Sequence, residues 1–168
     1  MPFKCGCRSL CLAFVLGFLP IPGPAICAAQ FTGAAISASS ALSIPQAQLI
    51  QPAELSEILG SSGSVKPTVF QVGSRVMFDQ AHIPGAQYAG PGSQPAGLES
   101  LAAKVAGLPK SASIVLYCGC CPWNRCPNVA SAFNQLRQLG FVNVKVLFIA
   151  NNFGDDWVNK GYRIEKGS

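Results

Sequence analysis

Short, continuous runs of apolar residues mark the chain from residue 68 onward. They are rich in β-branched and aromatic side chains, and Pro67 and Gly73 bound the first of them. Runs of this length and composition are typical of buried strands. They predict strands over residues 68–72, 114–117 and 143–149.

Between these runs, apolar residues recur with the spacing of an amphipathic helix. In residues 98–105 and 128–139 they fall at positions i, i+3, i+4 and i+7, which places them on one helical face. Residues 51–60 carry Pro52 in the first turn and Gly60 at the end, as many helices do. These three segments are therefore expected to be helices.

The alternation of strands and helices predicts an α/β fold, with a central, mainly parallel sheet flanked by helices on both faces. The sequence shows no internal repeat, so we expect a single domain over residues 49–168. A last turn at residues 155–160 is expected to bury Trp157. Residues 30–48, rich in Ala and Ser with little charge, are expected to form a flexible lead.

The first 29 residues have the layout of a secretory signal peptide. Lys4 and Arg8 give a basic start, residues 10–19 are apolar, and small residues end the segment at Cys27-Ala28-Ala29. We expect cleavage after Ala29 and export, to the periplasm if the source is bacterial. The apolar stretch is too short for a comfortable membrane span, so we expect no stable span once the segment is removed.

Net charge adds little to this picture. The 168 residues carry a formal charge of +5, and removal of residues 1–29 would take away two cations and leave +3. Lys and Arg do not cluster, so nucleic acid is not an expected partner.

Every cysteine outside the predicted signal peptide lies in one stretch of nine residues, 118–126. This stretch follows the predicted strand 114–117 and precedes the helix expected from Asn128. In α/β proteins, ligands bind at the carboxyl ends of the strands. Exported proteins commonly use cysteines to join distant segments, which these neighbours cannot do. The cluster therefore indicates chemistry rather than architecture.

A thiol between a strand end and a helix N-terminus lies among backbone N–H groups that favour the thiolate. Cys118, the first of the cluster, is the expected nucleophile. Cys121 is the alternative, because it is nearer to Arg125 in the sequence. Arg125 is expected to stabilise the thiolate or to bind an anionic donor, and Trp123 to contact a substrate or a partner.

Three kinds of chemistry remain open for the cluster. Cys120, Cys121 or Cys126 can resolve an oxidised Cys118 as a disulfide. An oxidising compartment can instead lock thiols into a static disulfide. Alternatively, the protein is a non-enzymatic thiol module whose four cysteines bind a soft metal, Cu(I) or Zn²⁺, or dock a redox partner. The first reading needs no cofactor.

Two stretches of the chain resemble the rhodanese-type sulfurtransferase domain. One is Phe78-Asp79-Gln80-Ala81-His82-Ile83-Pro84-Gly85-Ala86, which is similar to the family pattern aromatic-x-x-Gly-His-Ile-Pro-Gly-Ala. The other is the strand, Cys118, loop and helix that ends in Leu139-Gly140-Phe141-x-Asn143-Val144. Trp157 followed by Gly161-Tyr162 is similar to the closing turn of the family. The resemblance covers roughly residues 49–165.

This resemblance implies a rhodanese-like three-layer fold and a persulfide on Cys118, from which Cys120, Cys121 or Cys126 would relay the sulfur. The donor would be a small sulfur-containing anion or a persulfide, and the acceptor a thiol or a redox protein. His82 would help to shape the turn near the substrate pocket and is a candidate substrate-binding residue there. The chain departs from the family pattern in its longer cysteine loop and in Gln71-Val72-Gly73, where the family usually has Asp-x-Arg.

Overall fold

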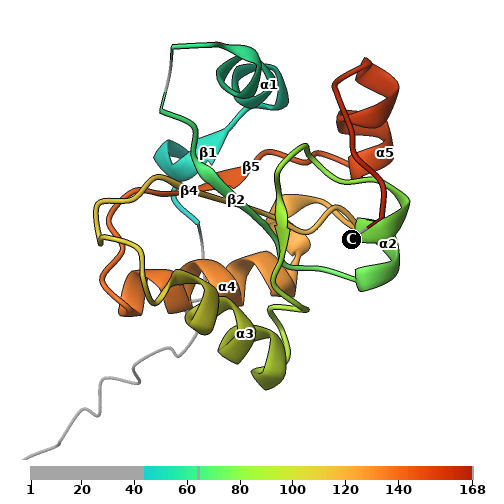
Figure 1. The fold of residues 1–168 in the computed structure, drawn as a ribbon. Coiled ribbons are helices and arrows are strands. Elements are labelled where there is room, and N and C mark those ends of the chain that lie inside the picture. The colour runs from blue at the N-terminus through green and yellow to red at the C-terminus, as the bar shows by residue number, and fades with distance from the viewer. Residues whose placement is uncertain (1–43, 64, 168) are drawn as a thin grey trace, which may run out of the picture. The chain divides into compact units, whose positions relative to one another are not determined.

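The computed structural model describes residues 44–63 and 65–167. The predicted signal peptide, residues 1–29, and most of the predicted lead lie outside the described residues. The described part forms three layers, with a sheet between two groups of helices (Figure 1).

The sheet has five parallel strands in the order β1-β5-β4-β2-β3. Their bounds are β1 Leu49–Ile50, β2 Thr68–Gln71, β3 Gln87–Tyr88, β4 Ile114–Tyr117 and β5 Val144–Leu147. The predicted α/β fold with a parallel sheet is therefore confirmed. All four residues of β4, the central strand, are buried, because helices cover both faces of the sheet.

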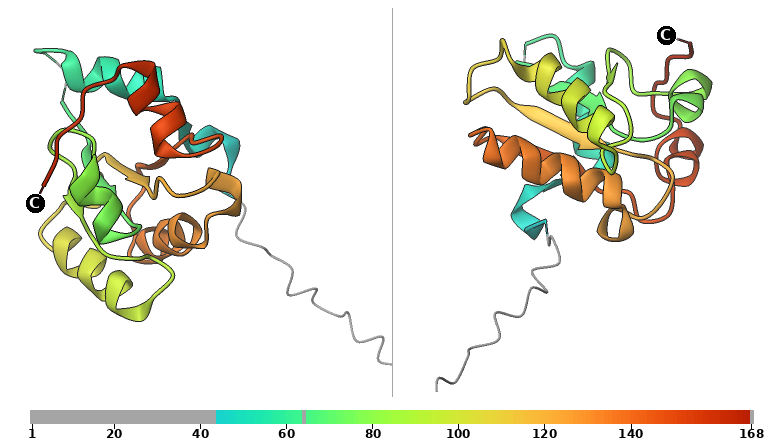
Figure 2. Two further views of the ribbon diagram at one scale, coloured as in Figure 1. Left: turned by 90° about the vertical axis from the view of Figure 1, so that its right-hand side faces the viewer. Right: turned by 90° about the horizontal axis from the view of Figure 1, so that it is seen from below.

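Two groups of helices cover the sheet. On one face lie α3 (Pro95–Val105) and α4 (Pro127–Gln138), side by side (Figure 2). The other face packs against α1 (Pro52–Gly60), α2 (Arg75–Gln80) and α5 (Phe153–Asp156). Three short 3-10 helices complete the structure, at Gln46–Gln48 (η1), Trp123–Arg125 (η2) and Val158–Lys160 (η3).

Alternate residues of β4 serve the two faces. Ile114 and Leu116 pack with α3 and α4, whereas Val115 and Tyr117 pack with α1, α2 and α5. A strand buried on both sides needs apolar residues at every position, which explains the continuous run in the sequence. Each fully buried large aliphatic side chain stabilises the fold by about 1.5–3 kcal/mol.

The structure confirms the three predicted helices and three predicted strands, with ends that differ by a few residues. Trp157 is in the core as predicted, at 1% exposed. The helix expected from Asn128 begins one residue earlier, at Pro127. The sequence did not predict β1, β3 or α2, because two to six residues are too few to show a period.

One core contact lies ahead of residue 49, the predicted start of the domain. Ile44 is only 4% exposed and belongs to the core beside α4. Five residues with one large apolar side chain carry no signal that separates a packed segment from a flexible lead.

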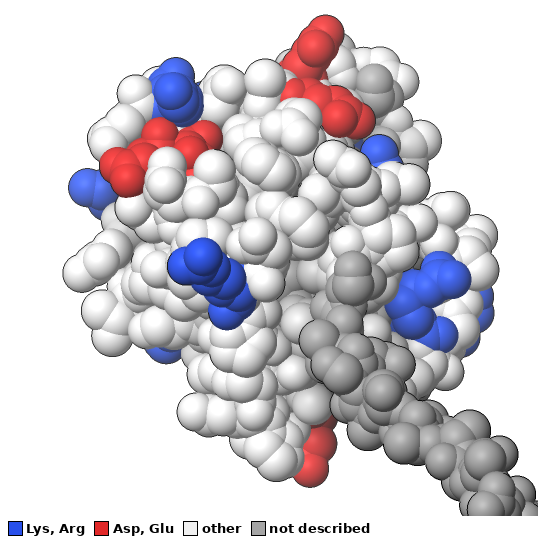
Figure 3. Space-filling view, turned by 180° about the vertical axis from the view of Figure 1, so that it is seen from behind, with Lys and Arg blue, Asp and Glu red and all other residues white. Residues whose placement is uncertain are grey.

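Two features of the surface complete the description. Within residues 44–63 and 65–167, no helix combines the length and apolarity that crossing a membrane requires. On the face drawn in Figure 3, charged side chains form small groups, in which basic and acidic ones are neighbours at the upper left, and broad uncharged areas lie between the groups.

Candidate active site

The cysteine cluster lies at the carboxyl edge of the parallel sheet. Cys118 follows β4 directly and is only 2% exposed. Gly119 then turns the chain with φ of +93°, a left-handed conformation that glycine adopts without strain. A Cβ at this position would also lie 3.0 Å from the Cβ of Phe153. Glycine is therefore required where the chain leaves the strand.

Backbone hydrogen bonds hold the loop at three points. The Phe153 N–H donates to the Gly119 carbonyl at 2.9 Å, and the Trp123 N–H donates to the Ile149 carbonyl at 2.9 Å. Cys126 is the N-cap residue of α4, and its carbonyl accepts from the Ala130 N–H at 3.2 Å. The loop is thus fixed to the ends of β5, α5 and α4, which positions its thiols.

The loop brings all four thiols of the cluster together. The Cys120 Sγ lies 3.2 Å from the Cys118 Sγ and 3.3 Å from the Cys121 Sγ. Cys118 and Cys126 are each 2% exposed, Cys121 is half-buried and Cys120 is exposed. The sulfurs therefore form a continuous row from the buried Cys118 to the surface.

The pKa of the Cys118 thiol is lowered to about 5. The largest cause is a hydrogen bond from the Cys126 thiol, which outweighs the opposing effect of burial. The Cys120 N–H, the Cys120 thiol and the Asn128 amide also donate to this sulfur. Cys118 is therefore a thiolate at neutral pH, and a thiolate is the nucleophilic form of cysteine.

The pKa values of the other two thiols in contact with Cys118, those of Cys120 and Cys126, are raised instead of lowered. Partial burial, together with hydrogen bonds to Cys118 and Cys121, raises the pKa of Cys120 to about 12. The hydrogen bond to Cys118 and burial raise the pKa of Cys126 well above its usual range. These thiols stay protonated while they donate to the Cys118 thiolate, so the three sulfurs share one negative charge.

Asn128 contacts the Cys118 sulfur from the first turn of α4, with its Nδ2 at 3.4 Å from the Sγ. Its Oδ1 accepts from the Ser93 N–H at 2.9 Å and from the Ser93 Oγ at 2.7 Å. A backbone N–H can only donate, so Ser93 fixes the amide with its oxygen turned away from the thiol. The Asn128 amide therefore presents an N–H donor to Cys118.

The neighbouring strand β2 supports the site from its carboxyl end. The buried Gln71 side chain donates from Nε2 to the Cys118 carbonyl at 3.0 Å, and its Oε1 accepts from the Gly73 N–H at 3.2 Å. A Cβ at Gly73 would lie 2.8 Å from both the Sγ and the carbonyl oxygen of Cys118. Gly73 thus allows the backbone after β2 to approach the thiol closely.

This arrangement matches a known family. Residues 51–148 match the family described as Rhodanese-like domain. The chain belongs to this family. The match covers more than half of the chain and includes β4 and the cysteine loop, so the resemblance noted in the sequence is confirmed.

Solved rhodanese-like structures have the same fold. The Alr3790 protein from Anabaena sp. has 24% identity and a TM-score of 0.55, over 70% of this chain and 92% of that chain. The BH2092 protein from Bacillus halodurans has 25% identity and a TM-score of 0.52, over 70% of this chain and 75% of that chain. No curated protein matches the sequence. The family match and the thiol cluster support a sulfurtransferase-like family for this rhodanese-like domain.

Trp123 and Arg125, the predicted substrate-binding residues of the loop, lie on η2. Trp123 is half-buried, and its ring centroid lies 6.2 Å from that of Phe148. Arg125 is exposed. The main contributions that lower the pKa of Cys118 come from Cys126, Cys120 and Asn128 rather than from Arg125. Binding of an anionic donor by Arg125 stays a prediction.

His82 is buried on the face of the sheet that α2 covers. Its Nδ1 lies 2.8 Å from the Phe78 carbonyl, and its ring stacks on the Phe78 ring with centroids 3.9 Å apart. Its Nε2 lies 3.7 Å from the Glu165 Oε2. The next residue, Ile83, donates its N–H to the Tyr117 hydroxyl at 3.2 Å, so the motif is tied to the residue before Cys118. These contacts describe a structural role for His82.

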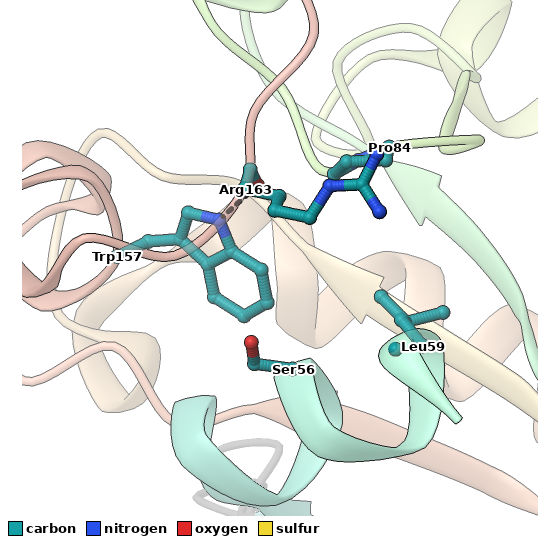
Figure 4. Close-up of a pocket in the computed structure, with 6 residues that line it drawn as sticks. Ser56, Leu59, Pro84, Trp157 and Arg163 are labelled. Carbon is teal, nitrogen blue, oxygen red and sulfur yellow. Dashed lines mark hydrogen bonds between the residues drawn. The ribbon is translucent and has the colours of Figure 1, made fainter.

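A small hollow on the same face contains none of the loop residues. Ser56, Leu59, Pro84, Trp157 and Arg163 line it, and the Trp157 Nε1 donates to the Arg163 carbonyl at 2.9 Å (Figure 4). This hollow is therefore separate from the cysteine loop.

Four residues of the site were missed in the sequence as contributors to it: Gln71, Gly73, Ser93 and Asn128. Gln71 and Gly73 stood out only as departures from the family pattern, and Asn128 only as a helix start. The sequence did hold a signal for Gln71 and Gly73. Both depart from the family pattern at the end of β2, and β2 pairs with β4, the strand that leads to Cys118.

Proposed function

We propose that this protein is an exported sulfurtransferase that accepts sulfane sulfur on Cys118. One observation carries the proposal: Cys126, the Cys120 N–H and Asn128 all donate to one buried sulfur at the carboxyl end of the central strand. Membership in the rhodanese-like family supports the same assignment for the residue that follows this strand.

The first step is attack by the Cys118 thiolate on the sulfane sulfur of a donor. With thiosulfate, the new bond joins the Cys118 Sγ to the outer sulfur, the S–S bond of the donor breaks, and sulfite leaves with the electron pair. The product is a Cys118 persulfide anion. Its negative charge remains in reach of the donors that stabilised the thiolate.

The second step uses a neighbouring thiol. Cys120 is best placed, because its Sγ lies 3.2 Å from the Cys118 Sγ. If Cys120, after loss of its proton, attacks the outer sulfur, the persulfide moves to Cys120 and Cys118 is regenerated. If it attacks the inner sulfur, a disulfide joins the two residues and hydrosulfide leaves. Cys121, whose Sγ lies 3.3 Å from the Cys120 Sγ, is the next carrier in such a relay.

The substrate is a small sulfur-containing anion or a persulfide carrier, and the final acceptor is a thiol or a redox protein. The exposed Arg125 and the half-buried Trp123 lie on the loop where such an anion approaches. The basic and apolar order of residues 1–29 supports export before the thiols act.

The experiment that tests this function uses the full chain, reduced and free of metal. The protein is incubated with thiosulfate or a polysulfide, and peptide mass mapping locates the added sulfur. We expect one sulfur on Cys118, or a disulfide from Cys118 to Cys120 after turnover, and no adduct in Cys118→Ser. Cys121→Ser is the matched control, which should still form the first persulfide.

Full labelling of Cys118→Ser, with sulfur on another loop cysteine, would overturn Cys118 as the acceptor. Absence of any adduct from either donor would overturn sulfur transfer itself. Export is tested separately by secretion of the full chain in a bacterial host, where a mature N-terminus at Gln30 is expected. Retention of Met1 in the secreted or retained protein contradicts cleavage after Ala29.

A further inference from the structure

Three of the four loop thiols form a compact group that a two-thiol transfer does not require. The Sγ atoms of Cys118, Cys120 and Cys126 all lie within 4.8 Å of one another. We propose that this group binds one Cu(I) ion through three thiolate sulfurs, with Cys121 outside the coordination sphere. This is a metal-binding activity in addition to sulfur transfer.

The spacing of the sulfurs suits a three-coordinate ion. A metal–thiolate bond is about 2.3 Å long, so three sulfurs in a plane around an ion lie about 4.0 Å apart. The Cys118 and Cys120 sulfurs are 3.2 Å apart and must therefore move apart slightly. Cys120 is exposed and can make this shift by rotating its side chain.

The type and number of ligands favour Cu(I) over Zn²⁺. Thiolate sulfur is a soft ligand that both ions accept. Structural Zn²⁺ is almost always bound by four ligands in a tetrahedron. Among the residues that the structure describes, no His, Asp or Glu joins the three sulfurs, and the Cys121 Sγ, 3.3 Å from the Cys120 Sγ, does not lie within 4.8 Å of all three. A soft monovalent ion that is satisfied by three ligands fits this set better.

Two of the three ligands are held in place before any metal binds. Cys118 extends from β4, and its carbonyl accepts a hydrogen bond from Gln71. Cys126 caps α4. Both are 2% exposed, so water has little access to the inner side of the site. Little ordering is then needed on binding, which favours high affinity.

The charge of the loaded site is partly balanced by the protein. Binding releases the protons of the thiols to solvent, and three thiolates with one Cu(I) carry a net charge of −2. The Cys120 N–H and the Asn128 amide both donate toward the Cys118 sulfur. Donors to a ligating sulfur orient it and stabilise its charge. The exposed Cys120 would also be the ligand that an incoming ion meets first.

A Cu(I) titration tests the proposal. It uses the full chain with Cys5, Cys7, Cys11 and Cys27 replaced by Ser, reduced and without oxygen, in competition with a chromophoric Cu(I) chelator. We expect one Cu(I) per chain. Cys120→Ser should weaken binding by more than about tenfold, since loss of a ligand costs at least as much as loss of a residue that orients one. Cys121→Ser should bind as the parent does.

The choice of Cys120 guards against a folding defect, because its side chain is exposed. Alkylation followed by mass mapping gives a second readout: Cu(I) should protect Cys118, Cys120 and Cys126 and leave Cys121 reactive. Equal weakening by Cys120→Ser and Cys121→Ser, protection of all four thiols, or absence of stoichiometric binding would each overturn the proposal. Because the titration contains no sulfur donor, none of these results bears on persulfide formation at Cys118.

Discussion

At the scale of single residues, the site is a set of thiols that differ only in what surrounds them. Cys118 receives hydrogen bonds from two other thiols, a backbone N–H and an amide, and its pKa is lowered to about 5. Cys120 and Cys126 supply those bonds and have raised pKa values. The surroundings therefore select one nucleophile among four identical side chains, which the sequence left open between Cys118 and Cys121.

This selection predicts a titration at low pH. As the pH rises through about 5, the Cys118 proton is lost, and the ultraviolet absorbance of the thiolate should increase by one thiolate per chain. Cys120 and Cys126 should not add to this signal up to about pH 8, because they ionise later. Cys118→Ser should lack the low step. A first step near the usual thiol pKa of about 8.5 in the reduced parent contradicts this electrostatic account.

Asn128 is predicted to affect the site by lowering the pKa of Cys118 through its hydrogen bond to the sulfur. A hydrogen bond to a charged group contributes about 1.5–3 kcal/mol, and one pKa unit corresponds to about 1.4 kcal/mol. Asn128→Ala should therefore raise the pKa of Cys118 by about one unit, the lower end of this range, because the Asn128 amide is the smallest of the causes; the same absorbance titration measures the change. Asn134→Ala is the control on the same helix, because the Asn134 amide donates to the Ala130 carbonyl instead. An unchanged titration in Asn128→Ala would show that its donor is not needed.

At the scale of elements, the site depends on how closely β2 and β4 end beside each other. A Cβ at Gly73 would meet two atoms of Cys118 at 2.8 Å and the Gln71 Nε2 at 3.0 Å. Gly73→Ala should cost about 1–3 kcal/mol of unfolding free energy, as overpacking does, and should slow sulfur acceptance. Gly60→Ala is the control, since nothing lies within 4 Å of its Cβ position. Equal stability of the two variants in denaturant titrations would contradict the close approach.

The elements also show what the sequence could and could not predict. The strands 68–72 and 114–117 and the helix 128–139 follow from apolar spacing, which depends on near neighbours in the sequence. The contacts that tune Cys118 join residues far apart: Gln71 is 47 positions from Cys118, and Ser93 is 35 from Asn128. Such contacts depend on strand order and register, which no local pattern specifies. Arg125 was predicted as the stabilising cation from proximity in sequence, whereas the main donors come from Cys126, Cys120 and Asn128.

At the scale of the whole molecule, the rhodanese-like fold supplies a rigid frame, and the lengthened loop supplies extra chemistry. The parallel sheet fixes Cys118 at its carboxyl edge, and α4 fixes Cys126 and Asn128. Between these anchors, the loop adds Cys120 and Cys121 without disturbing the core on either face. The same thiols are then available for sulfur and for a soft metal, but Cys118 cannot serve both at once.

This shared use predicts competition between the two proposed activities, and the prediction rests on both. One equivalent of Cu(I) should block persulfide formation on Cys118, because a sulfur bound to the metal shares its negative charge with the cation and is a weaker nucleophile. The measurement is mass mapping after thiosulfate or polysulfide treatment, with and without one Cu(I) per chain. Cys120→Ser, which loses a metal ligand and keeps the nucleophile, should need more than about tenfold more free Cu(I) for the same block. Unimpaired persulfide formation in a chain that holds one Cu(I) would place the metal away from Cys118.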